Sequence, residues 1–94
     1  MLVEVTLGGR QWKIDTNAPI RKVWGYCHYD KMLIQVSKGT HKAGKYRDVL
    51  IHECLHAIYP FLTEDAINRG ATELDRMLTV ACPESPKEPP CESA

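Results

Sequence analysis

The sequence predicts a small α+β domain in which an antiparallel sheet of three to four strands packs on two helices. Three observations lead to this fold class. Short runs that alternate apolar and polar residues, or are rich in β-branched and aromatic residues, fill the first part of the chain. Two longer stretches with apolar residues at helical spacing follow. The end is rich in proline and glutamate, so we expect residues 1–81 to form one domain and residues 82–94 to be a disordered tail.

Four segments are predicted to be strands. Residues 2–7 and 11–15 flank a Gly-Gly pair, which is typical of a β-hairpin. Residues 22–27 are rich in aromatic and β-branched residues, and residues 32–37 form the most apolar of the four strands. Because we expect the strands to be mainly antiparallel, one face of the sheet would pack on the helices.

Two helices are predicted after the strands. The first lies between Tyr46 and Tyr59, a stretch without glycine or proline that ends before Pro60. The second runs from Thr63, a good N-cap residue, to about Val80, and acidic residues in its first turn suit the helix dipole.

The segment between the strands and the first helix, residues 38–47, is predicted to be a locally basic loop. Its lysines would either contact a phosphate or an acidic substrate, or simply form a solvated surface.

The first helix carries the motif His-Glu-x-x-His, formed by His52, Glu53 and His56. Residues four apart lie on the same face of a helix, so the two imidazoles can bind one metal ion from one side. Glu53 is placed to reach a water on that metal rather than the metal itself, and this is the arrangement of a zinc hydrolase. The alternative is a pair of core histidines with other partners, because a buried polar group without one costs about 1–3 kcal/mol.

Catalytic zinc usually has three protein ligands, so we expect a third ligand from the second helix. The candidates are Glu64, Asp65 and Glu73. The apolar stripe of this helix must face the first helix and the sheet. At about 100° per residue, Glu64 lies about 60° from the centre of that stripe, Glu73 about 120° and Asp65 about 160°. We therefore predict Glu64 as the ligand, with Glu73 as the alternative; Glu64 would otherwise only complement the helix dipole.

The composition narrows the possible functions. The chain has 94 residues and a net charge of zero, so we expect no general binding to nucleic acid or to anionic membranes. No apolar run approaches the roughly 20 residues of a membrane-spanning helix, and the first residues do not resemble a signal peptide, so we expect a cytoplasmic protein. The four cysteines form no C-x-x-C pair, and Cys54 is expected to be a small buried residue rather than a ligand.

These residues resemble the gluzincin group of zinc metallopeptidases. Residues 51–57, an aromatic-proline turn and residues 62–67 are similar to very small metallopeptidase-like proteins that are common in phages and prophages and distantly related to ImmA/IrrE-type peptidases. In such proteins a pair of strands precedes the metal helix, and residues 24–26 and 34–36 suit that place. The resemblance covers roughly residues 20–80.

The resemblance implies a zincin-like domain in the cytoplasm, for instance of a phage-infected host. It implies Zn²⁺ bound by His52, His56 and Glu64, with Glu53 as the general base. The second-helix motif of gluzincins usually continues with an aspartate that supports a ligand histidine. If Glu73 were the ligand, Met77 would occupy that place.

The expected function is therefore a zinc metallopeptidase that hydrolyses peptide bonds in a peptide or protein substrate. An extended substrate is expected to add to the edge of the sheet along residues 32–36. A further group should stabilise the developing oxyanion, and the candidates are Tyr26, His28, Tyr29 and Tyr59.

Two other classes of protein compete with this function. One is a zinc-stabilised binding module or inactive protease-like protein that acts on a protein or nucleic-acid partner through basic side chains, namely Lys38, Lys42, Lys45 and Arg47. The other is a structural protein without a metal. A zinc scaffold needs both histidines but has no need of Glu53, so the intact motif favours hydrolysis.

Overall fold

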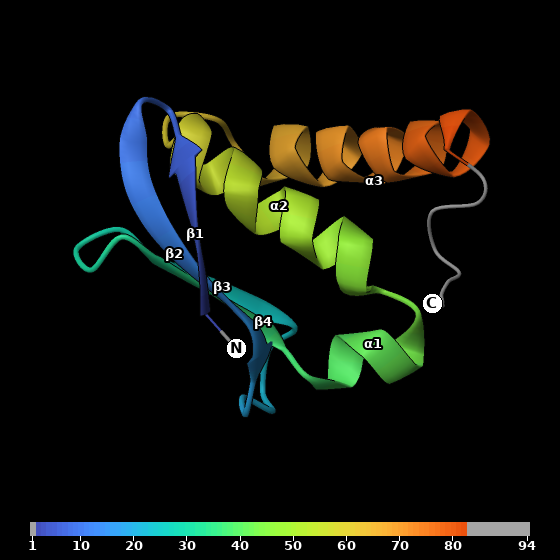
Figure 1. Ribbon diagram of the computed structural model, residues 1–94. Coiled ribbons are helices and arrows are strands. Elements are labelled where there is room, and N and C mark those ends of the chain that lie inside the picture. Colours follow the sequence, from blue (N-terminus) through green and yellow to red (C-terminus); the bar gives the residue numbers. More distant parts are fainter. Residues whose placement is uncertain (1, 83–94) are drawn as a thin grey trace.

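Four strands and three helices make up the part of the chain that the computed structural model describes, residues 2–82 (Figure 1). The α+β class predicted from the sequence is confirmed. Residues 83–94 of the predicted tail lie outside the described residues. The elements are, in chain order, β1 (Leu2–Leu7), β2 (Arg10–Ala18), β3 (Gly25–His28), β4 (Leu33–Ser37), α1 (Gly39–Ala43), α2 (Tyr46–Ile58) and α3 (Glu64–Ala81).

The hairpin predicted around the two glycines is present, with β1 and β2 paired antiparallel. Gly8 and Gly9 have φ angles of 59° and 79°, and two-residue hairpin turns of this kind need a positive φ at both positions. β2 continues to Ala18, which is three residues beyond the predicted end at Asp15.

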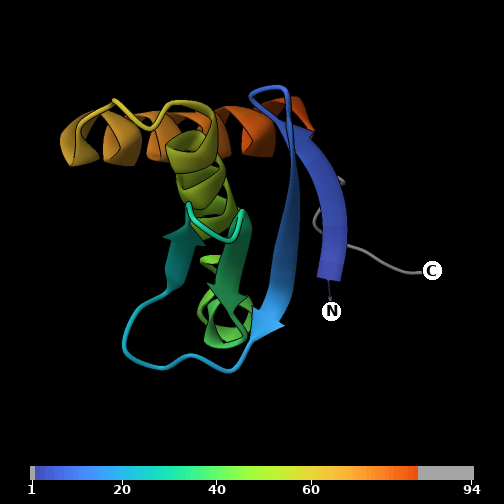
Figure 2. The ribbon, with the colours of Figure 1, turned by 90° about the vertical axis from the view of Figure 1, so that its left-hand side faces the viewer.

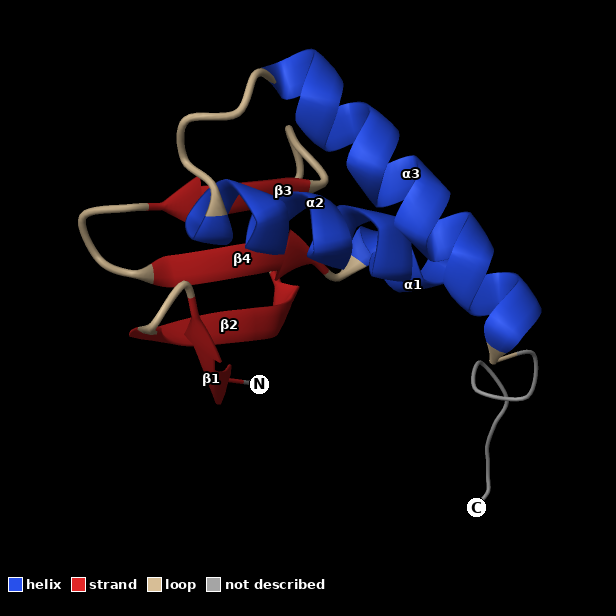
Figure 3. Cartoon of the chain, turned by 90° about the horizontal axis from the view of Figure 1, so that it is seen from above, coloured by secondary structure: helices blue, strands red, loops and turns tan. Residues whose placement is uncertain are grey.

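The four strands form one sheet in the order β1-β2-β4-β3 (Figure 3). The sheet is mixed, because β2 and β4 pair in parallel while the other two pairings are antiparallel. The sheet is therefore mainly antiparallel, as predicted, with one parallel pairing at its centre. The interior position suits β4, the most apolar strand, because Ile34 and Val36 are completely buried there.

This order corrects the expected sheet edge. β4 has a partner strand on each side, so a substrate cannot add along residues 32–36 as predicted. β3 is the edge strand next to the helices. It begins at Gly25 rather than at Lys22, and it ends at His28, one residue beyond the predicted end at Cys27. Residues 19–24 instead form a connection that passes the end of β4 (Figure 2).

A short helix, α1, lies within the predicted basic loop, so the prediction of a loop over residues 38–47 was wrong. The side chain of Thr40 is completely buried, and its Oγ1 donates a hydrogen bond to the Ser37 carbonyl at 2.8 Å. Gly44, with a φ of 72°, ends the helix. A helix of five residues has too few apolar positions to show a helical period, so the sequence pattern did not indicate it.

The core lies between the sheet and α2. Its buried members are Trp12 and Ile14 from β2 together with Ile34 and Val36 from β4. Val49, Leu50, Cys54 and Ala57 pack against them from α2. α2 thereby covers one face of the sheet, as Figure 3 shows from above.

The second predicted helix packs chiefly on α2 rather than on the sheet. Ile67 and Ala71 of α3 are completely buried, and a side chain added at Gly70 would meet Leu55 of α2 at 3.4 Å. Among the described residues, no helix combines the length and the apolar character that crossing a membrane requires.

An ion pair joins the start of α2 to the last turns of α3. Arg47 Nε donates to Asp75 Oδ1 at 2.6 Å, and its Nη2 donates to the Asp75 carbonyl at 3.2 Å and to Thr79 Oγ1. The Arg47 side chain is thus hydrogen-bonded within the fold, whereas a binding module would use its basic side chains to contact a partner.

We expect Arg47→Ala to lower the free energy of unfolding by about 1 kcal/mol, because it removes a half-exposed ion pair and two further hydrogen bonds. Urea unfolding followed by circular dichroism would measure the change. Arg76→Ala, at an exposed position of α3, is the control and should change stability by less than half as much. Equal effects of the two substitutions would contradict a structural role for Arg47.

Candidate metal centre

Three side chains converge where the last turns of α2 meet the start of α3. His52 Nε2 lies 3.2 Å from His56 Nε2 and 3.0 Å from Glu64 Oε2, and His56 Nε2 lies 3.2 Å from Glu64 Oε1. One potential ligand atom from each residue therefore lies around a common point. The imidazoles are mostly buried while the Glu64 side chain is 63% exposed, so the group opens to solvent on the side of α3.

The donor set and its spacing fit zinc. Two imidazole nitrogens and a carboxylate are ligands that zinc accepts, and bonds of about 2.0–2.2 Å in a tetrahedron place neighbouring donor atoms roughly 3.3–3.6 Å apart. The observed separations are 3.0–3.2 Å, so a movement of a few tenths of an ångström suffices.

Local structure positions each of the three ligand candidates. His52 and His56 are four residues apart on α2, so their rings lie on the same helix face. Glu64 is the first residue of α3, and the N-cap residue Thr63 fixes this start by accepting a hydrogen bond from Ala66 N at 3.1 Å. The short connection between the helices therefore returns the chain directly to the histidines.

The other two carboxylates considered as ligands lie elsewhere. Asp65 and Glu73 line a separate surface depression on α3 together with Arg69 and Arg76. The structure thus brings Glu64 to the histidines and leaves Glu73 and Asp65 outside the group. The role of Glu64 as a ligand stays a prediction.

Glu53 points in another direction from the histidines, towards β3. Glu53 is only 8% exposed. A Cβ placed on Gly25 would lie 3.0 Å from Glu53 Oε2 and 2.8 Å from Val49 Cγ1, so a glycine is needed where β3 passes this side chain. Burial raises the pKa of the Glu53 carboxyl, the nearby His52 lowers it, and Glu64 raises it.

A groove with a volume of about 270 Å³ gives access to the group. It is lined by the three ligand candidates, by Glu53 and by residues of β3 and its flanks, namely Val23, Gly25, Tyr26, Cys27 and Tyr29. Tyr26 and Tyr29 are therefore the two oxyanion candidates that reach the groove. Tyr29 Oη donates to the His56 carbonyl at 3.2 Å. Burial and the neighbouring Cys27 and Glu53 raise the pKa of the Tyr29 phenol, which favours its protonated form.

The remaining two oxyanion candidates do not line this groove. His28 stacks on Tyr26, with ring centroids 4.5 Å apart, and its Nε2 lies 2.8 Å from Gln35 Oε1. Tyr59 packs edge-on against Phe61.

Cys54 lies outside the ligand group, as expected, and packs against the core. Burial, followed by the charge of Glu53, raises the pKa of its thiol to about 11, and the same two causes raise that of Cys27 to about 12. Both thiols are therefore protonated near neutral pH, whereas a zinc ligand must be a thiolate.

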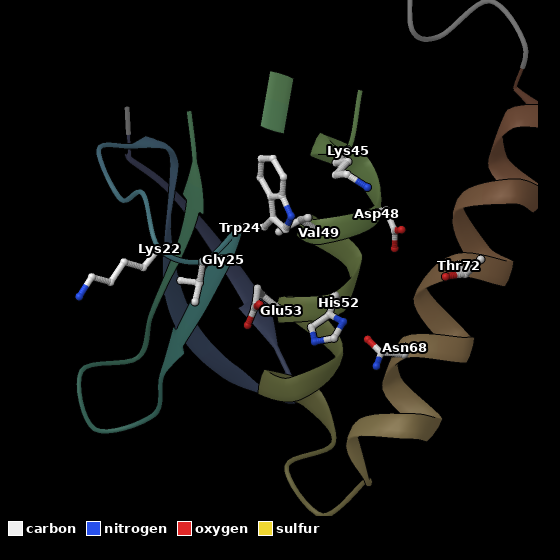
Figure 4. A pocket seen from close by; sticks show the side chains of 11 residues that line it. Lys22, Trp24, Gly25, Lys45, Asp48, Val49, His52, Glu53, Asn68 and Thr72 are labelled. Carbon is white, nitrogen blue, oxygen red and sulfur yellow. The ribbon is translucent and has the colours of Figure 1, made fainter. Parts of the chain in front are cut away.

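Two residues of the site were missed by the sequence analysis. A glycine within a predicted strand often marks a close approach of another element, and this signal could have indicated Gly25. Asn68 follows Glu64 by one helical turn, and its side chain points toward the His52 ring (Figure 4). Spacing of four residues on α3 could have indicated it, because such residues share a helix face.

Comparisons with family models, with curated proteins and with solved structures found no match to this chain.

We expect one zinc ion per chain to bind to this group, and Glu64→Ala to weaken binding far more than Glu73→Ala. A site with two histidines alone lacks the third protein ligand that zinc usually has. Competitive zinc titration with a fluorescent chelator would measure both affinities, with His52→Ala as the reference for a lost ligand. If Glu73→Ala lost zinc while Glu64→Ala kept it, the assignment of the third ligand would be wrong.

Gly25→Ala should displace Glu53 and lower stability by about 1–3 kcal/mol, because the added methyl overlaps Val49 and Glu53. Thermal unfolding would measure the loss. Gly39→Ala is the matched control, since its added methyl meets other atoms only at 3.6 Å and beyond. A Gly25→Ala protein as stable as the Gly39→Ala protein would show that β3 and α2 do not pack this closely.

Proposed function

We propose that this protein is a zinc-dependent metallopeptidase, with His52, His56 and Glu64 as the zinc ligands and Glu53 as the general base. One observation carries the proposal. Three potential ligand atoms surround one point, and the buried carboxylate of Glu53, on the same helix as the two histidines, lines the same groove. A metal that only stabilised the fold would require no carboxylate at this place.

When bound, zinc lowers the pKa of a water to about 7 and polarises the carbonyl of the scissile peptide. The protein's own contribution begins with Glu53. Its carboxylate accepts a proton from the attacking water and then donates this proton to the nitrogen of the leaving amine. The close approach of Gly25 restricts the carboxylate to the groove, so the proton is accepted and released at one place.

The groove also offers a donor for the developing oxyanion. Tyr29 is the better placed candidate, because its hydroxyl already lies 3.2 Å from the carbonyl of His56. A small rotation would turn this hydroxyl from the backbone to a substrate oxygen. Tyr26, which is 53% exposed on the edge strand, is the second candidate.

An extended substrate would add to β3, since this is the strand with a free edge beside the groove. The backbone groups of Gly25–His28 on that edge would then orient the substrate over the zinc ligands. This proposal replaces the addition along residues 32–36, which the position of β4 rules out.

Glu53→Gln should retain zinc and the fold but lose hydrolysis by at least about a hundredfold, because the amide has nearly the same shape and cannot accept a proton. Cleavage of mixture-based peptide libraries, read by mass spectrometry, would supply a substrate and the rate. Metal analysis of the same samples would establish equal loading. Glu73→Gln is the control and should cleave at the wild-type rate. A Glu53→Gln protein with full zinc and full activity would exclude Glu53 as the base.

A further inference from the structure

A second cavity, of about 450 Å³, adjoins the candidate metal centre (Figure 4). It shares Val23, Gly25, His52 and Glu53 with the groove over the zinc ligands. The two hollows therefore adjoin at these four residues. The proposed mechanism leaves this second cavity unused.

The cavity lies between the connection before β3, α2 and α3. Trp24 and Val49 provide apolar surface on one side, and Asn68 and Thr72 of α3 provide polar groups on the other (Figure 4). Lys45 lies at the far end, with its Nζ 5.9 Å from the centroid of the Trp24 ring, within the range of a cation–π contact. This contact holds the ammonium group at one end of the cavity.

The distance between Lys45 and the candidate metal centre suits contact with a substrate residue close to the scissile bond. Lys45 precedes His52 by seven residues along the chain, mostly within α2, and this corresponds to about 10 Å. An extended peptide covers that distance with about three residues. A side chain within three residues of the scissile bond can therefore reach the ammonium group.

The cavity is lined by two lysines, Lys45 and Lys22, and by two carboxylates, Asp48 and Glu53. Lys22 points away from α2 and so lies at the rim (Figure 4). A neighbouring hollow on the other side of Trp24 is lined by Arg21, Lys22 and Lys38 and by no acidic residue among those described. Apart from the general base, Asp48 is the only acidic residue among the described lining of either hollow.

Asp48 opposes part of the lysine charge. It belongs to the first turn of α2, where a carboxylate complements the positive end of the helix dipole. Asp48 follows Lys45, the N-cap residue of α2, by three residues, and Figure 4 shows the two side by side. The Lys45 ammonium group therefore lies between the Trp24 ring, at 5.9 Å, and the Asp48 carboxylate.

We propose that this cavity is a substrate subsite that selects an acidic side chain within about three residues of the scissile bond, with Lys45 as the specificity-determining residue. This inference rests on the proposed peptidase function. The substrate class is thus a peptide or protein segment that carries aspartate or glutamate beside the cleavage site. Trp24 would pack against the aliphatic part of the acidic side chain while Lys45 pairs with its carboxylate.

Matched peptides test this specificity. Each pair differs only by glutamate or glutamine at one of the three positions on either side of the bond that the zinc-loaded wild type cleaves. At one position we expect kcat/KM to be about two- to fivefold higher for glutamate, the range for a solvent-accessible ion pair. The ratio should decrease as salt increases, because salt screens exposed charges.

Two variants of opposite sign serve as matched controls. Lys45→Gln should bring the glutamate-to-glutamine ratio close to one, whereas Asp48→Asn should increase it, since it removes the opposing charge. Neither residue belongs to the proposed ligand set or acts as the base. A general loss of folding would lower cleavage of both peptides equally and leave the ratio unchanged.

Binding provides a second readout that needs no turnover. The chain has two tryptophans, of which Trp12 is 3% exposed and Trp24 46% exposed, so peptide binding at the cavity should alter the fluorescence of Trp24. The titration uses the zinc-loaded Glu53→Gln protein and the same peptide pairs. Trp24→Phe in the same background should abolish the change in fluorescence.

The outcomes separate the inference from the proposed function. Cleavage and binding without a preference for glutamate, or a preference that Lys45→Gln leaves intact, would overturn the inference while the peptidase function stands. A preference for glutamate in binding, without cleavage of any peptide by the zinc-loaded wild type, would overturn the peptidase function and leave acidic recognition in place.

Discussion

The packing of α2 between the sheet and α3 is the constraint on which the rest of the structure depends. On one side, Val49, Leu50 and Cys54 meet the core formed by β2 and β4. On another side, Leu55 meets α3 at Gly70. Full burial of an aliphatic side chain contributes about 1.5–3 kcal/mol, and these partly buried side chains each contribute a share of it. A rotation of the helix about its axis would expose several of them. The directions in which His52, Glu53 and His56 point are fixed by this packing.

The two parts of the candidate centre face different neighbours for the same reason. Successive residues of a helix are separated by about 100°, so His52 and Glu53 cannot point at the same element. The histidines meet Glu64 at the start of α3, and Glu53 meets Gly25 on the edge strand. The groove follows from this division, since it lies between β3 and α3 with α2 beneath it. A substrate bound there would contact the three ligand candidates and Glu53 together.

The site also contains a group whose burial is unfavourable for the stability of the fold. Glu53 is buried, and a carboxylate removed from water costs free energy unless it has partners. Burial shifts the pKa of Cys27, Cys54 and Tyr29 upward, so these neighbours are neutral near pH 7 and add no further negative charge. The proposed catalytic role accounts for a carboxylate that packing by itself would replace with an apolar side chain. Arg47, by contrast, serves the fold through its pairing with Asp75.

Local signals in the sequence determined the elements and the motif. The hairpin at Gly8 and Gly9, the extent of α2, and the start of α3 at Thr63 depend on residues close together in the chain, so turn chemistry, helical period and capping were enough to predict them. The approach of Glu64 to the histidines was also predictable, because a short connection leaves the start of α3 little choice of position. The predictions that a substrate adds to a sheet edge along residues 32–36 and that residues 38–47 form a loop were wrong.

Only the tertiary structure decided the order of the strands and the shape of the site. β4 rather than β3 lies beside β2, because the interior position buries Ile34 and Val36 completely, and this places β3 at the edge. α3 packs on α2 because the sheet face is already covered. The contact of Gly25 with Glu53, and the cavity that Trp24 and Lys45 form, join residues more than twenty positions apart. Such contacts result from competition among many segments for the same buried surface, which no local pattern in the sequence expresses.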